Sequence, residues 1–431
     1  MESFLQWIII LIVVIVLSRV AALLASRFGI SALTIQLSVG ILLGPSLFNL
    51  LGVPMVLGTW GSPSSDPLHS ALKILAEIGL IQLMFLAGLK VDWHELKKLF
   101  KSSFSVGAWE FVLTAVSVAI IARIFVDHWA EALAVSAVVS ASSFGISIYY
   151  FSEMKILGSR AAIIASGAAI LSGLLAILLM IASQATNYAA THGALKMAIA
   201  VSWFLAKLVM FIAVGYFLTS RFLRLASKSG FSKRPRQMLV GYLLLVAALY
   251  AWAAMHFGSF AAAGVASLGG ALLGLSNLEV KEQIAKGYAS TLASIPVEIL
   301  FMVIGMEVNL KAVEGSTIFL TVLLVAVIGA KLIGVLIARH RADESLSDRL
   351  LFTIGILPQG EMGILIAAYL FSRGLVNPSQ LSAAIIVVAT LTMFAPVLLK
   401  IASAELSRKE LTVAPPFTGG SERHRSISKN G

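Results

Sequence analysis

Residues 355–363 read Gly-Ile-Leu-Pro-Gln-Gly-Glu-Met-Gly, and they interrupt an apolar stretch that extends from about residue 349 to residue 372. Residues 140–147, Ser-Ala-Ser-Ser-Phe-Gly-Ile-Ser, interrupt a second apolar stretch in the same way. Glycine and proline in a membrane helix free backbone groups that hydrocarbon cannot satisfy, so such segments line a cavity or pack inside protein. The two interruptions therefore predict two broken membrane helices. For either segment taken alone, close helix packing or a simple kink is the other interpretation.

The composition places the rest of the chain in the bilayer as well. Of 431 residues, 59% are hydrophobic and 12% are charged, whereas soluble domains are about half apolar and a quarter charged. The absence of Cys excludes disulfides and thiolate metal sites. The net charge of +11 would suggest nucleic acid in a soluble protein. Here the Lys and Arg residues lie between apolar stretches, so they indicate topology and no nucleic-acid partner is expected.

The apolar stretches are long enough to be membrane-spanning helices. A span needs about 20 apolar residues, and windows of that length predict about thirteen spans. They lie near residues 4–25, 30–51, 71–89, 103–126, 130–152, 159–183, 194–219, 237–256, 259–277, 288–310, 315–338, 349–372 and 380–403.

The positive charges lie in alternate loops. Lys and Arg residues follow the third, fifth, seventh, ninth and eleventh spans, whereas loops 51–70 and 184–191 are poor in them. Because cytoplasmic loops carry the excess of Lys and Arg, this alternation predicts an external N-terminus and a cytoplasmic C-terminus. We expect a multi-pass protein of the inner (plasma) membrane, with residues 405–431 as a disordered cytoplasmic tail.

An odd number of spans suggests an internal repeat. The seventh span and the loop Arg221–Arg236 would join two six-span halves in opposite orientations, the arrangement of inverted-repeat transporters. The two interrupted spans are then the fifth of each half. The predicted fold class is an all-α polytopic membrane protein with inverted six-helix repeats and two broken crossing helices. Such paired breaks predict a substrate site between them at the membrane midplane.

Three ionisable residues lie within predicted spans close to these breaks. Glu110 is in the fourth span and Lys331 in the eleventh, which are corresponding helices of the two halves, and Glu361 is inside the second break. A charge at the bilayer centre costs about 2.5–3.5 kcal/mol, so each is a candidate functional residue. A buried lysine stays charged only beside a carboxylate. Lys331 is therefore either half of a structural ion pair or a titrating group that competes with a cation. Glu361 either satisfies freed backbone groups or belongs to the ion site.

Several short motifs occur in the order and spacing of a known transporter family. They are Glu77-Ile78-Gly79 with Phe85-Leu86-Ala87-Gly88-Leu89, Gly305-Met306-Glu307-Val308-Asn309, Lys331-Leu332-Ile333-Gly334, Pro358-Gln359-Gly360-Glu361 and Thr390-Leu391-Thr392-Met393-Phe394-Ala395-Pro396. Across nearly all of residues 1–404, the chain resembles the second branch of bacterial monovalent cation:proton antiporters. That branch includes sodium/proton exchangers and Kef-type potassium efflux systems.

The resemblance implies an architecture and a mechanism. Residues 1–404 would form the transmembrane domain, with a panel of spans one to three and eight to ten and a core of spans four to six and eleven to thirteen. The core would move against the panel in an elevator-like manner. The transported partners would be a monovalent cation and a proton, and the assembly would be a homodimer surrounded by lipid. No glycine-rich strand–helix signature follows the last span, so we expect no appended nucleotide-sensing domain, and no cofactor is expected.

The chain departs from the family pattern where the family binds its ion. Ser172 and Gly173 stand where the resemblance expects an Asp-Asp or Asn-Asp pair, and Gln359 stands in place of an arginine. A neutral Ser-Gly pair cannot supply the charge for which Na⁺ or K⁺ and protons compete. Glu110 would replace that charge if it faced Lys331 from the neighbouring helix. The alternative is that Glu110 only neutralises Lys331.

The sequence therefore predicts an ion site and leaves three functions open. The candidate site residues are Glu110, Lys331, Ser172, Gly173, Ser142, Ser143, Gln359 and Glu361. Cation/proton antiport is the leading prediction. The alternatives are transport of an anion or a proton-coupled organic acid by the same fold, and a non-transporting sensor or scaffold. Neither a His-Glu-x-x-His nor a Gly-x-Ser-x-Gly motif is present, so we do not expect an enzyme.

Overall fold

The computed structural model describes residues 2–28, 31–49, 67–193, 295–313, 316–338, 346–372 and 374–413, with isolated positions between 195 and 221. Within these ranges the protein is built of helices and contains no strand, as the predicted all-α class requires. The eighth and ninth predicted spans and most of the loop Arg221–Arg236 lie outside the described residues. The count of about thirteen spans and the inverted halves therefore stay predictions.

The described helices divide into those before and those after residues 222–294. The first set is α1 (Glu2–Phe28), α2 (Ala32–Leu43), α3 (Pro67–Lys90), α4 (Trp93–Lys98), α5 (Phe100–Phe125), α6 (Trp129–Ser140), α7 (Phe144–Glu153) and α8 (Arg160–His192). The second set is α13 (Ile295–Met306), the 3₁₀ helix η2 (Leu310–Val313), α14 (Thr317–Ile337), α15 (Leu346–Gly355), α16 (Gly360–Ser372) and α17 (Pro378–Val413).

Many of these helices have the length and composition of membrane spans. Within the described residues, 6 helices are long and apolar enough to cross a bilayer, or 7 if the bent pair α15–α16 counts as one span. Ala32–Leu43 and Ile295–Met306 are shorter apolar helices. The last helix, α17, continues to Val413, so it overlaps the first part of the predicted tail, residues 405–431. The remainder of that tail lies outside the described residues.

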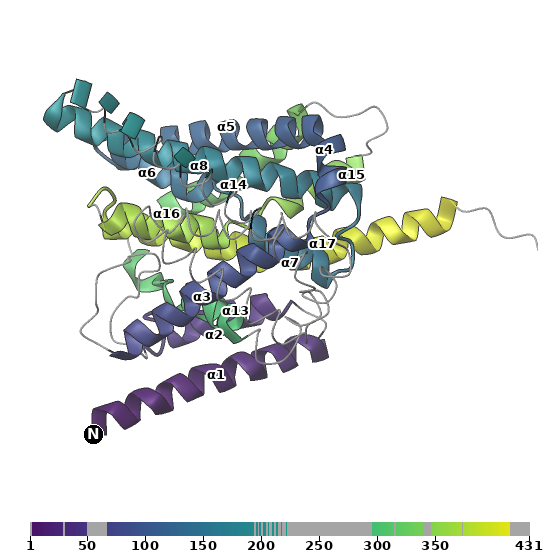
Figure 1. Cartoon of the computed structure of the whole chain (residues 1–431), viewed down its shortest axis with the longest axis horizontal. Coiled ribbons are helices and arrows are strands. Elements are labelled where there is room, and N and C mark those ends of the chain that lie inside the picture. Colours follow the sequence, from purple (N-terminus) through teal and green to yellow (C-terminus); the bar gives the residue numbers. More distant parts are fainter. Residues whose placement is uncertain are drawn as a thin grey trace, which may run out of the picture.

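The helices pack in two groups with α7 and α16, the second halves of the two broken helices, between them (Figure 1). In one group, α5 packs against α14, α8 and α6. In the other, α13 packs against α2 and α3, and α1 lies against α2. The helices α7, α16 and α17 lie between the two groups in this view, and α7 contacts both α3 and α8. The halves of the broken helices that follow the two breaks are therefore enclosed by protein on both sides.

The first predicted interruption is present between α6 and α7. The α6 helix ends at Ser140, and α7 begins at Phe144. Ser143 caps α7, because its Oγ accepts a hydrogen bond from the backbone N–H of Ile146 at 3.0 Å. A serine that caps a helix in this way satisfies one of the donors that the helix leaves open at its start.

The second interruption separates α15 from α16, which meet at an angle of 42°. The α16 helix is capped from another part of the chain. Thr392 on α17 uses its Oγ1 to accept hydrogen bonds from the N–H groups of Gln359 at 3.3 Å and Gly360 at 3.0 Å. Because hydrocarbon offers no such partner, α17 must lie against the break for α16 to begin there.

Close backbone contacts bring α5 against its neighbours. A Cβ atom placed on Gly334 of α14 would lie 2.5 Å from Cα of Glu110, and one on Gly107 would lie 2.9 Å from Cα of Ala168 on α8. Small residues allow helices in a membrane to approach this closely. The α5 helix is therefore fixed between α14 and α8, and Glu110 lies at the contact with α14.

Two glycines of α14 provide a test of this packing. Gly334→Ala should destabilise the protein by about 1–3 kcal/mol, because the added methyl group overlaps backbone that cannot move aside. Gly329→Ala is the matched control, since no atom lies within 4 Å of a Cβ at that position. Its expected effect is a gain of up to about 1 kcal/mol from helix propensity. Unfolding of the purified protein in detergent measures both changes, and equal effects of the two substitutions would contradict the packing.

Candidate ion site

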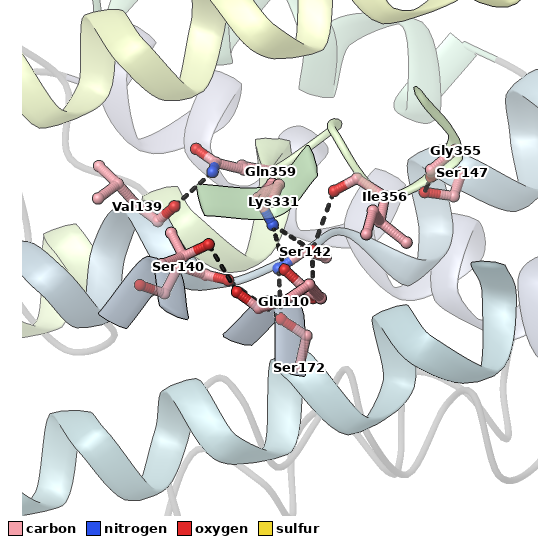
Figure 2. A network of polar contacts seen from close by, with 11 residues as sticks. Glu110, Val139, Ser140, Ser142, Ser147, Ser172, Lys331, Gly355, Ile356 and Gln359 are labelled. Atoms are coloured by element: carbon pink, nitrogen blue, oxygen red, sulfur yellow. Dashed lines mark hydrogen bonds and ion pairs between the residues drawn. The ribbon is translucent and has the colours of Figure 1, made fainter. Parts of the chain in front are cut away.

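A buried ion pair lies at the contact between α5 and α14. Nζ of Lys331 is 2.9 Å from Oε2 of Glu110, and both side chains are 0% exposed (Figure 2). Glu110 thus faces Lys331, as the hypothesis of a replaced acidic pair requires. Removing one partner of such a pair would leave an uncompensated charge in a low-dielectric interior. Each residue therefore requires the other.

Ser142, in the break between α6 and α7, joins the ion pair to both broken helices. Its Oγ accepts a hydrogen bond from Nζ of Lys331 at 2.7 Å. The same oxygen lies 3.1 Å from Oε1 of Glu110 and 3.0 Å from the carbonyl oxygen of Ile356, which directly follows α15. Figure 2 shows Ser142 at the centre of this network. Polar groups from α5, from α14 and from the end of α15 therefore meet around this one hydroxyl group.

Ser172 on α8 supports the first break. Its Oγ donates to the carbonyl oxygen of Ser140 at 3.0 Å and accepts from the backbone N–H of Ser142 at 3.3 Å. Gly173 lies beside it, where a Cβ atom would be 3.3 Å from Cε of Met362 and 3.9 Å from the carbonyl oxygen of Ser142. In place of an acidic pair, this part of α8 presents a hydroxyl group that satisfies backbone freed by the break.

The two breaks are also bonded to each other directly. The N–H of Ser143 donates to the carbonyl oxygen of Pro358 at 2.7 Å. Nε2 of Gln359 donates to the carbonyl oxygen of Val139 near the end of α6. The predicted meeting of the two interruptions is therefore present, although they are about two hundred residues apart in the chain.

Glu361 lies where two helices begin. Its carboxylate accepts hydrogen bonds from Oγ of Ser143 and from the N–H of Gly145, the latter at 3.1 Å, and both donors belong to the start of α7. Glu361 itself is in the first turn of α16. Since the N-terminus of a helix carries about half a positive charge, the carboxylate compensates two of them. Of its two predicted roles, the structure shows the first: it satisfies freed backbone groups.

The C-terminal ends of α6 and α15, on the other side of the breaks, lie beside a positive charge. The α6 and α15 helices both end near Lys331, as the contact of Ser142 with Ile356 indicates. Helix C-termini carry about half a negative charge each, so the ammonium group compensates them. Lys331 must also compensate the carboxylate of Glu110. One positive charge therefore compensates three sources of negative potential, two helix C-termini and one carboxylate, and this part of the site favours a further cation or proton.

Sequence reasoning found the side chains with unusual chemistry but missed others. All eight candidate residues lie in or against the breaks. It missed Thr392 and Ser147, whose Oγ donates to the carbonyl oxygen of Gly355 at 2.7 Å. Thr392 did lie in a quoted motif, but nothing marked its hydroxyl as a cap. Another buried acid, Glu298, lies elsewhere and pairs with Arg19 of α1 at 2.9 Å.

A bundle of apolar helices with two broken helices that meet around a buried ion pair defines a secondary membrane transporter. A family model for "Sodium/hydrogen exchanger, transmembrane" matches residues 10–403. The chain belongs to this family, and the resemblance to monovalent cation:proton antiporters is thereby confirmed.

Similar proteins cover almost the whole chain. The "Probable Na(+)/H(+) antiporter GerT" of Bacillus cereus is 22% identical over 390 residues, which are 90% of this chain and 97% of that protein. An Na(+)/H(+) antiporter of Enterococcus hirae is 24% identical over 402 residues, 92% of this chain and 97% of that protein. The solved structure of the sodium proton antiporter MjNhaP1 from Methanocaldococcus jannaschii shares the fold. Its TM-score is 0.68 at 17% identity, over 94% of this chain and 99% of that one.

The ion pair predicts strong coupling between two substitutions. Glu110→Gln or Lys331→Met alone should destabilise the protein by about 3–5 kcal/mol, because each leaves a buried charge unpaired. The double variant should recover most of that loss. Denaturant unfolding in detergent measures the double-mutant cycle. The exposed pair Glu95–Lys98, at 2.6 Å, is the control, and its loss should cost no more than about 1 kcal/mol. Additive effects of the two core substitutions would refute the pairing.

Proposed function

We propose that this protein exchanges a monovalent cation, Na⁺ or K⁺, for protons. The observation that carries the proposal is the Glu110–Lys331 pair, fully buried where the two helix breaks meet. Buried acids and bases at such a break are typical of ion-coupled transport. The names of the relatives, which are Na(+)/H(+) antiporters, support the same activity.

In this proposal Glu110 supplies the charge that the acidic pair supplies in the family. The ammonium group of Lys331 occupies the position of a cation, with Glu110 at 2.9 Å and Ser142 at 2.7 Å. An alkali cation that enters would take these oxygens as ligands and separate Lys331 from its carboxylate. Lys331 then compensates the two helix C-termini beside it, and Glu110 holds either the cation or a proton. Cation binding and proton release are thereby linked, and the charge of the site is unchanged.

The two packing groups support an elevator-like movement. The core would consist of α5, α6, α7, α8 and α14 to α17, and the panel would include α1, α2, α3 and α13. Hydrogen bonds between this core and the panel include Lys90 to Ser152 at 2.9 Å and the N–H of Ala32 to Glu153 at 3.3 Å. These contacts lie at helix ends, where they can be exchanged with water as the core moves.

The assembly and orientation are part of the proposal. Large apolar side chains are exposed along α1, including Ile12, Val16 and Leu23. They fit lipid or a second copy in a homodimer. The alternation of Lys and Arg between loops supports an external N-terminus, a cytoplasmic C-terminus and a place in the inner membrane.

The pairing of Lys331 argues against the anion alternative. An anion site needs a positive charge that the protein does not already neutralise. Lys331 is bonded to Glu110 and Ser142, and it is 0% exposed. The ion pair therefore favours a cation as the substrate.

Reconstituted flux tests the proposed function. In proteoliposomes with an internal pH dye and an imposed pH gradient, added Na⁺ or K⁺ should dissipate the gradient, and choline should not. The double variant Glu110→Gln/Lys331→Met should remain folded and give no cation-dependent flux, because its site has no exchangeable charge. The same cations as chloride and gluconate salts are the control for the anion. Flux that follows the anion would contradict the proposal, and no flux with any salt would favour the sensor or scaffold alternative.

A further inference from the structure

The hydroxyl group of Ser142 has two hydrogen-bond acceptors beside it but only one proton to donate. It accepts from Lys331, and it lies within hydrogen-bond distance of two acceptors, Oε1 of Glu110 at 3.1 Å and the carbonyl oxygen of Ile356 at 3.0 Å. A serine hydroxyl has one proton to donate. It can therefore satisfy Glu110 or Ile356, but not both at the same time.

The two acceptors belong to different parts of the machinery. Glu110 is half of the ion pair, whereas the carbonyl of Ile356 is freed where α15 ends. Among the hydrogen bonds of the described residues, the one from Ser142 is the bond that this carbonyl receives. Whether the Ser142 hydroxyl donates to Glu110 or to Ile356 therefore also decides whether the carbonyl at the second break is hydrogen-bonded.

We propose that Ser142 is a positioning residue that couples the protonation of Glu110 to the break between α15 and α16. This inference rests on the proposed cation/proton exchange. With Glu110 ionised, the hydroxyl donates to the carboxylate, because a hydrogen bond to a charged acceptor is about twice as strong as a neutral one. The carbonyl of Ile356 is then without its donor, and the break is free to rearrange.

A proton on Glu110 reverses the arrangement. Oε1 then carries the proton and donates it in a hydrogen bond to Oγ of Ser142. The lone pairs of Ser142 receive Lys331 and Glu110, so its own proton points to the carbonyl of Ile356. No covalent bond to Ser142 changes, and the proton stays on Glu110. The break is anchored when the acid is neutral and released when it is ionised.

Among the groups around Glu110, Ser142 is the one that connects its carboxylate to the break between α15 and α16. Lys331 on α14 is the charged side chain that faces it. On α6 the charged residue is Glu131 in the first turn, and α8 carries Arg160 at its first position, both away from the pair. Glu361 of α16 is bonded to Ser143 and the N–H of Gly145 at the start of α7. Charge on Glu110 therefore reaches the second break through Ser142.

The test compares two serines at the same boundary. Ser147 is the matched control, because its Oγ also bonds α15, at 2.7 Å from the carbonyl oxygen of Gly355, but does not contact the ion pair. Ser142→Ala should move the midpoint of the pH profile of cation/proton exchange to higher pH by about one unit, the effect of losing one hydrogen bond to a charged group. Ser142→Thr, which keeps a hydroxyl group, should have the pH profile of the unmodified protein. Ser147→Ala should leave the midpoint unchanged, whatever it does to the rate.

A second measurement does not depend on transport. Infrared difference spectra of the purified protein across a pH series report the C=O stretch of protonated Glu110, assigned by its loss in the Glu110→Gln/Lys331→Met variant. Ser142→Ala should shift this band and its midpoint, and Ser147→Ala should not. If Ser142→Ala does not fold, Ser142→Cys, with its weak thiol donor, should give a smaller shift in the same direction.

The results separate this inference from the proposed function. Equal pH midpoints for Ser142→Ala, Ser147→Ala and the unmodified protein, in flux and in the infrared band, would overturn the coupling while leaving the exchange intact. Absence of flux from the unmodified protein would instead contradict the exchange, and the infrared comparison would still decide whether Ser142 senses the charge of Glu110.

Discussion

Hydrocarbon offers no hydrogen bonds, so every backbone group freed at a break in a membrane helix must find its partner within the protein. The two breaks in this structure provide most of these partners for each other. The N–H of Ser143 donates to the carbonyl of Pro358, and Glu361 accepts from the start of α7. Neighbouring helices supply the rest, through Ser172 of α8 and Thr392 of α17. Neither broken helix could keep its form without the other, and the packing of α8 and α17 follows from the same need.

The charges of the core follow from the same breaks. Four helix ends meet in the interior of the protein, two positive and two negative. Glu361 lies at the positive ends and Lys331 at the negative ends. Glu110 is the additional charge. Because Lys331 must compensate both Glu110 and two helix C-termini, the balance at this point is incomplete. An exchanger needs such a position, since a fully compensated site would bind neither a cation nor a proton. The sequence match shows the family. The exchange at Glu110 is our proposal for how a member without the acidic pair transports a cation.

The parts of this site that could be predicted from sequence are those with a high cost in a membrane. Glu110 and Lys331 were identifiable because charges in apolar spans are expensive and because the predicted repeat puts the two residues on corresponding helices. The breaks were identifiable from their glycine and proline residues. Thr392 was not, because a threonine in a helix commonly bonds to its own backbone, as this one does to Val388 at 2.7 Å. The carbonyl of Ile356 was also unpredictable, since every residue has one and only the fold selects it. The panel and core, the number of spans and the dimer stay predictions, because they depend on residues outside the described ranges or on a second chain.

The central claim is that Glu110 supplies the charge for which a cation and a proton compete. Equilibrium binding of radioactive sodium or rubidium to the purified protein, measured over a pH series, tests it most directly. The account predicts saturable binding that weakens as the pH falls, because protons then occupy the carboxylate. It also predicts that the Glu110→Gln/Lys331→Met variant, in which no buried charge is stranded, binds no cation at any pH. Cation binding by that variant with the pH dependence of the unmodified protein would contradict the claim.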